Sequence, residues 1–291
     1  MSSRRCEWSG FGHKAVAAVA VALFLAASSS PGQSPRPRNN PQAKDNSNNL
    51  LASDLRAKDP PALTANAIVE KMMAANGRRS AELRGYQATR SYNLQYRGLL
   101  GSRNAEMKVV ARYTAPGQRD FSVISQSGSK LLLNRVLLKL LDSEKEASRN
   151  QKQVELSPAN YQFEFLGTDR VPGGAPCYLL AVKPQHDNKF LYRGKIWVDA
   201  SDFAVVRMQG QPAKSPSFWI KDTEINANWE KVGDFWFIKQ NHSVSHIRMG
   251  GMADLTIEYA DYQITGVDTR GPHNRSESPV LPDPSSVTPQ R

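Results

Sequence analysis

The chain has 291 residues, of which 40% are hydrophobic, and it carries a formal net charge of +11. These values exclude a wholly disordered protein, because a folded part of about 200 residues can bury a sizeable core. The surplus of positive charge favours anionic partners, of which a phospholipid membrane surface is one.

The first residues have the pattern of a secretory signal peptide. Arg4, Arg5 and Lys14 precede an apolar run over residues 15–27, and small residues follow that run. A helix of this length is shorter than the hydrocarbon core of a bilayer, which favours cleavage over a transmembrane anchor. We therefore expect residues 1–28 to be a signal peptide and the mature protein to be periplasmic or secreted. Nucleic acid is not an expected partner in those compartments.

Two segments that flank the folded part lack the apolar residues needed for a core. Residues 29–61 are rich in Ser, Pro, Asn, Gln and charged residues, which predicts a disordered linker. Residues 267–291 contain several prolines and few apolar residues, which predicts a disordered tail. One folded domain is therefore expected over residues 62–266.

The domain is predicted to open with a helix. Thr64 is a suitable N-cap for it. Apolar residues then recur at helical spacing, at Ile68, Val69, Met72 and Met73. Asn76 and Gly77 form a typical C-terminal stop, so the helix is expected to end there.

Strands are predicted for most of the remaining domain. In the first of them one side carries Tyr86, Ala88, Arg90, Tyr92, Leu94 and Tyr96. Further strands are expected at residues 107–113, 121–123, 161–165, 177–182, 195–199, 203–208, 217–221, 224–231, 235–246 and 254–264. Tight turns join most of them, which predicts one antiparallel sheet of about 10–11 strands that tends to curl.

A second helix is predicted to interrupt the strands between Ser129 and Ala147. One face carries Leu133, Val136, Leu137 and Leu140, with Leu132 and Leu141 at its margins. Leu131 and Leu138 fall on nearly the opposite side. A surface helix normally has one apolar stripe. The helix is therefore expected either to pack between two parts of the core or to form a lid between the sheet and a ligand.

No catalytic or metal site is predicted. His242 and His246 form the only close histidine pair, and in a strand they lie roughly 13 Å apart, too far to share a metal ion. Glu144 and Glu146 have basic neighbours on the second helix, a pattern typical of solvated ion pairs. Cys177 lies in an apolar run and is expected to be a small core residue. We expect no cofactor and no enzymatic activity.

Four tryptophans are predicted to lie in strands: Trp197, Trp219, Trp229 and Trp236. Each alone is consistent with ordinary sheet packing, and together they are consistent with a deep apolar groove.

The order of elements and two stretches of sequence resemble a known family. The stretches are YRGKIWVDASDFAVVRMQG and NWEKVGDFWFIKQNHS. They are similar to the LolA/LolB-like superfamily of outer-membrane lipoprotein-sorting proteins, within a branch of exported proteins, over about residues 62–266.

The resemblance implies an α+β, β-rich fold: an incomplete antiparallel β-barrel of about 10–11 strands wrapped around an N-terminal helix and an inserted lid helix. It also implies a hydrophobic cavity that holds acyl chains, and an inward arginine on an early strand that fastens the lid. Arg90 is the candidate for that arginine. The candidate cavity and lid residues are Arg90, Tyr92, Leu131, Val136, Leu138, Trp197, Trp219 and Trp236.

The resulting hypothesis is a monomeric periplasmic carrier whose partners are the acyl chains of a lipid or lipoprotein. An anionic membrane surface is a further expected contact. The alternative is a protein-interaction or stress-sensing module of the cell envelope that uses the same groove for a peptide or protein.

Overall fold

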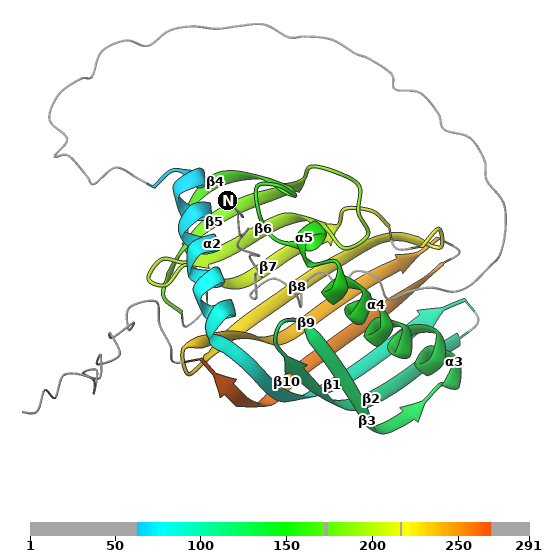
Figure 1. Ribbon diagram of the computed structural model, residues 1–291. Coiled ribbons are helices and arrows are strands. Elements are labelled where there is room, and N and C mark those ends of the chain that lie inside the picture. Colours follow the sequence, from blue (N-terminus) through cyan, green and yellow to red (C-terminus); the bar gives the residue numbers. More distant parts are fainter. Residues whose placement is uncertain (1–62, 100, 172–173, 216, 249, 269–291) are drawn as a thin grey trace, which may run out of the picture.

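The computed structural model describes residues 63–99, 101–171, 174–215, 217–248 and 250–268 (Figure 1). Its strands are β1 (Leu83–Gly98), β2 (Gly101–Thr114), β3 (Gln118–Gly128), β4 (Tyr161–Arg170), β5 (Pro176–Pro184), β6 (Tyr192–Asp199), β7 (Val205–Pro212), β8 (Ile220–Val232), β9 (Phe235–Ile247) and β10 (Gly251–Val267). The predicted signal peptide and linker lie outside these residues, as does the tail beyond its first two positions.

All ten strands form one antiparallel sheet in the order β3-β2-β1-β10-β9-β8-β7-β6-β5-β4. β3 and β4 are its edges, so the sheet is open. Helix α2 (Ala65–Glu82) precedes β1, and α2 and α4 (Leu138–Arg149) lie on the same face of the sheet (Figure 1). We call this face the inner face and the opposite one the outer face. The predicted β-rich fold, an incomplete barrel with helices, is confirmed.

The alternation predicted for β1 is confirmed. Tyr92 and Leu94 are buried, whereas Ser91 and Asn93 are exposed. β1 pairs with β2 on one side and with β10, the last strand of the sheet, on the other. Arg90 shares the buried side with its apolar neighbours. The strand therefore carries a charged group onto the inner face.

Helix α2 begins where predicted and ends later. The Ala67 backbone N–H donates a hydrogen bond to Thr64 Oγ1 (3.3 Å), which confirms the N-cap. The predicted end at Asn76 and Gly77 is wrong, because the helix continues to the residue before β1. Gly77 stays helical, and Asn76 Oδ1 accepts a hydrogen bond from Arg79 Nη1 (3.0 Å). A side-chain bond within the helix thus replaces the predicted stop.

The predicted second helix is present with a π turn near its start. Its parts are α3 (Lys130–Leu132), the π-helix η1 (Leu133–Leu137), α4, and the short α5 (Gln151–Val154). Its buried leucines and valine come in adjacent pairs spaced by four residues: Leu132 and Leu133, Val136 and Leu137, Leu140 and Leu141. A four-residue spacing drifts by about 40° per step around an α-helix. The wider π turn cancels this drift and keeps the pairs facing the sheet.

One large apolar core fills the space between the helices and the inner face. It includes Ile68 and Met72 of α2, Leu137 of η1, and side chains from most strands. Leu138 is half-buried and packs against this core, whereas Leu131 is 43% exposed. The two leucines predicted to share a second patch therefore lie in different environments.

The predicted strands at residues 217–221 and 224–231 are a single strand, β8. Trp219 precedes it in a turn and is half-buried. A register shift between Ile220 and Asp222 marks the place where the pairing with β9 is irregular. Among the described residues, no helix is both long and apolar enough to cross a bilayer.

Leu137→Ala is expected to lower the free energy of unfolding by about 2–5 kcal/mol, because it leaves a cavity at a fully buried site. Leu131→Ala, in the same helical segment, should change it by no more than about 0.5 kcal/mol. Urea unfolding followed by circular dichroism measures both. Similar losses in the two variants would contradict the assignment of the buried face.

Candidate ligand-binding site

A buried ionic cluster connects α4 to the inner face of the sheet. Glu144 of α4 accepts hydrogen bonds from Arg90 Nη1 on β1 (2.6 Å) and Arg119 Nη1 on edge strand β3 (2.5 Å). Arg90 Nη2 donates a further bond to the same carboxylate (3.1 Å). Glu144 is only 6% exposed, and both arginines are buried. We call these three residues the Glu144 cluster.

The Glu144 cluster contains two cations and one anion, so it buries one net positive charge. The Nε atoms of Arg90 and Arg119 have no hydrogen-bond partner within the described part of the chain. The Arg90 guanidinium lies 5.1 Å from the Phe121 ring centroid and 5.0 Å from that of Tyr259. Cation–π contacts of this kind partly offset the cost of burying the surplus charge.

The two arginines control the protonation of Glu144. Burial by itself raises the pKa of this carboxyl group, but Arg90 and Arg119 outweigh burial and hold the pKa below its ordinary value of 4.5. The carboxylate is therefore charged at neutral pH. It remains a hydrogen-bond acceptor for both guanidinium groups.

The prediction that Glu144 is a solvated residue is wrong. Glu144 follows Leu140 by four residues and precedes Ala147 by three, so it lies on the buried stripe of the helix. Arg119 was not singled out, although it alternates with the half-buried Phe121 on β3. The burial of both residues could be predicted from the sequence, from the helical spacing of Glu144 and from the strand alternation of Arg119. Glu146, the other predicted ion-pair residue, does lie at the surface, where it binds Lys189.

Three predicted site residues lie together on the inner face. Arg90, Tyr92 and Val136 are all buried, and Tyr92 and Val136 belong to the main core. Leu138 lies at the margin of that core, and Leu131 faces away from it. The three candidates on the helical segment therefore differ in burial: Val136 is buried, Leu138 is half-buried and Leu131 is exposed.

The structure does not bring the tryptophans into one groove. Trp197 packs with Cys177 and Val206 in a separate cluster, because it alternates with the inward Ile196 and Val198 on β6. Trp219 lies in a turn. Trp229, which is not among the candidate cavity residues, lies in the main core. The predicted strands were largely correct. Trp236 packs against both the main core and the Trp197 cluster, so strand parity separates the tryptophans only in part.

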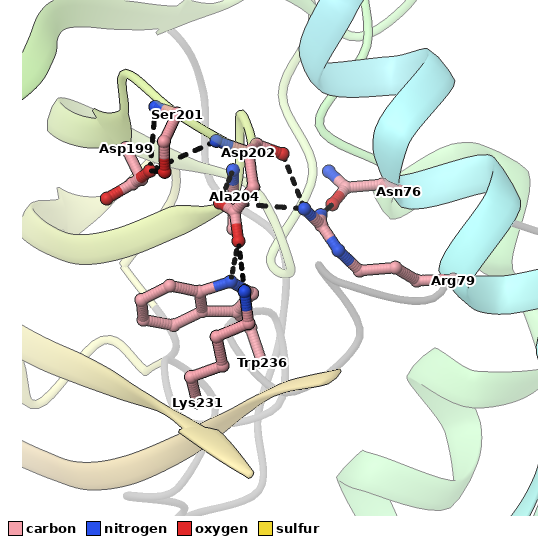
Figure 2. A network of polar contacts seen from close by, with 8 residues as sticks. All are labelled: Asn76, Arg79, Asp199, Ser201, Asp202, Ala204, Lys231 and Trp236. Atoms are coloured by element: carbon pink, nitrogen blue, oxygen red, sulfur yellow. Dashed lines mark hydrogen bonds and ion pairs between the residues drawn. The ribbon is translucent and has the colours of Figure 1, made fainter. Parts of the chain in front are cut away.

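Trp236 belongs to a polar network around Asp202, which connects α2 with two hairpin turns (Figure 2). Trp236 Nε1 donates a hydrogen bond to Asp202 Oδ2 (2.7 Å), and Lys231 Nζ binds the same oxygen (3.1 Å). Arg79 of α2 donates to the Asp202 backbone carbonyl. Asp199 Oδ1 accepts a bond from the Ser201 backbone N–H (2.8 Å), which orders the turn. The network fixes the position of α2 against these two turns. That structural role accounts for the contacts of Asp202 and Trp236.

A groove of about 610 Å³ lies on the outer face over β10, β1, β2 and β3. Most of its lining side chains alternate with core residues and are polar: Ser91, Asn93, Gln95, Glu106, Lys108, Ser125, Ser127, Asp254, Thr256 and Glu258. Its polar lining is unsuited to acyl chains. The apolar surface of the domain is instead on the inner face, beneath the helices.

The described residues contain no cluster of three or more His, Cys, Asp or Glu side chains that could hold a metal ion. His242 and His246 each bind a separate carboxylate, Asp254 and Asp222. Burial raises the pKa of the Cys177 thiol, which makes it a poor nucleophile.

No protein-family model and no curated protein matches the chain. Solved structures with similar folds include an outer membrane lipoprotein-sorting protein domain from Vibrio parahaemolyticus, with 14% identity, 72% of this chain and 95% of that chain covered, and a TM-score of 0.40. The fold is similar to LolA-superfamily structures. One from Nitrosomonas europaea has 10% identity, coverages of 70% and 94%, and a TM-score of 0.31.

A complex of MucA and MucB from Pseudomonas aeruginosa also has a chain with a similar fold. It has 10% identity, coverages of 67% of this chain and 94% of that chain, and a TM-score of 0.23. At these identities the likeness concerns the fold alone.

Glu144→Gln is expected to lower the free energy of unfolding by about 3–5 kcal/mol at neutral pH, because it leaves two buried guanidinium groups without a counter-charge. Arg90→Met should cost less, about 2 kcal/mol at most, because the remaining Arg119 and Glu144 form a neutral pair. Urea unfolding of the two variants tests this order. Equal losses would show that charge balance does not govern the cluster.

The stability that Glu144 contributes should depend on pH. Its pKa is lower in the folded than in the unfolded protein, so the contribution is complete above about pH 4.5 and is lost as pH falls through the folded pKa. The measurement is the difference in unfolding free energy between the wild type and Glu144→Gln, from neutral to acidic pH. This difference should shrink on acidification; a constant difference would contradict the assignment.

Proposed function

We propose that the domain is a periplasmic binding or carrier protein that holds acyl chains of a lipid or lipoprotein against its inner face. The observation that carries this proposal is the covering of an apolar sheet face by one helical segment that a single buried ionic cluster holds. In this proposal residues 1–28 are a cleaved signal peptide that exports the chain.

The segment α3–η1–α4 acts as a lid in this proposal. Its buried side contributes Leu133, Leu137 and Leu140 to the same core as Met107 and Val109 of the sheet. If the lid moves away, the apolar surface of these sheet residues is uncovered, and an acyl chain can cover it again. Each buried methylene contributes about 0.8 kcal/mol, so a long chain can offset the free-energy cost of moving the lid.

The described conformation corresponds to the closed state of the lid. The resemblance to carrier proteins implied a preformed hydrophobic cavity, whereas the inner face here is occupied by core side chains. Cargo therefore has to displace the lid. Opening must also separate Glu144 from Arg90 and Arg119, which leaves two cations beside the exposed apolar surface.

One observation favours the alternative, a protein partner in the cell envelope. Edge strand β3 exposes two adjacent apolar residues, Val123 and Ile124, beside an unpaired backbone edge. Exposed edges of this kind can accept a strand from another protein. We favour acyl-chain binding because the largest apolar surface lies beneath the lid.

The test uses the full chain, purified from cells and analysed for bound lipid by mass spectrometry, then delipidated and titrated with a fluorescent long-chain fatty acid. The wild type should bind the probe at about one site. Arg90→Met should bind it about tenfold more tightly, if losing the Arg90 bonds shifts the closed–open equilibrium by about 1.4 kcal/mol.

Arg112→Met is the matched control, because Arg112 lies exposed on the outer face of β2 and binds Gln87 there. It should bind the probe as the wild type does. Absence of probe binding in all three proteins, or copurification of one protein partner at equal amounts without lipid, would overturn the carrier proposal.

A further inference from the structure

One end of the sheet exposes large apolar side chains. Leu99, in the β1–β2 turn, is 84% exposed, and Phe218, in the segment between β7 and β8, is 75% exposed. The Trp219 ring lies edge-on to Phe218, with centroids 5.4 Å apart, and is half-buried. Single exposed apolar residues are common, so the significance of these depends on their neighbours.

The β9–β10 turn joins these side chains into one surface. A methyl group built on Gly250 would lie 3.3 Å from Leu99 Cδ1, so Leu99 covers this turn. On its other side the Arg248 guanidinium carbon lies 5.4 Å from the Phe218 ring centroid. The Arg248 backbone N–H also donates to the Trp219 carbonyl (2.8 Å). The three connecting segments therefore form one continuous end surface.

The end surface is basic. Residues 98–103, 213–221 and 248–252 include no Asp or Glu. Five basic side chains in and beside these segments are exposed: Arg97, Arg103, Lys214, Lys221 and Arg248. None of the five forms an ion pair with another described residue. Their charges are available to an external anionic partner.

The opposite end of the sheet is different. Its turns carry Asp199, Asp202 and Asp234, and Asp202 binds Arg79 and Lys231 there. Two basic side chains at that end, Arg79 and Lys231, are thus paired within the domain. The two most exposed large apolar side chains among the described residues, Leu99 and Phe218, lie at the end surface together with these five basic residues.

We propose that the end surface docks on a membrane that contains anionic phospholipids. Apolar and aromatic tips beside lysine and arginine suit a bilayer interface, where rings enter the head-group region and cations bind lipid phosphates. The docking face consists of Leu99, Phe218, Arg97, Arg103, Lys214, Lys221 and Arg248. This inference stands independently of acyl-chain binding, because it uses none of the lid residues.

The test compares sedimentation of the full chain with two kinds of vesicle: pure phosphatidylcholine, and equal parts of phosphatidylcholine and phosphatidylglycerol. The wild type should partition onto the anionic vesicles, and less at high ionic strength. Phe218→Ser with Arg248→Gln should weaken partitioning about tenfold. Both side chains are exposed, so this double variant should retain the circular dichroism spectrum of the wild type.

The control is Arg112→Gln with Val267→Ser, which also removes one exposed basic and one exposed apolar side chain, but away from the end surface. It should partition as the wild type does. Both double variants retain residues 1–62. Any vesicle binding through that segment therefore contributes equally to both. Hydrogen exchange in the presence of anionic vesicles should slow in residues 98–103 and 213–221. Equal partitioning of both variants, or unchanged exchange there, would overturn the proposal.

Discussion

The burial of one carboxylate between two guanidinium groups fixes the position of α4 over the sheet. Glu144 is held by arginines from β1 and β3, strands that lie next to β2 on either side. The bonds require α4, the third strand of the sheet and an edge strand to keep one relative position. Buried ion pairs contribute little net stability but tolerate few alternative geometries. The cluster therefore specifies the arrangement of α4, β1 and β3 more than it adds to stability.

The two faces of the sheet differ in polarity. The inner face carries the core and the helices, whereas the outer face carries a polar groove and solvent-facing pairs such as His242 with Asp254. A ligand with a long hydrocarbon chain has only the inner face as apolar surroundings. In the proposed function, binding there competes with the protein's own side chains, so the affinity depends on how stably the helices cover this face.

Local sequence patterns were sufficient to predict most of the fold. The site was predicted less well, because its contacts join residues that are far apart in the sequence. Strand alternation and the Thr64 N-cap were readable because both depend on neighbouring residues. Glu144 was misassigned because basic residues lie close to it in the chain, while its actual partners are 54 and 25 residues away. The face of Trp197 depends on strand parity beside a register shift between Trp197 and Val198. A single sequence does not indicate such irregularities.

The π turn near the start of the second helical segment affects which side chains face the sheet. Relaxing it into a regular α-helix shifts the preceding residues by one position, which rotates them by about 100° around the helix axis. Leu131, now turned outward, and Leu132, now buried, differ by that same single position. The π turn thus sets which of the two leucines the first turn of the segment presents to the sheet.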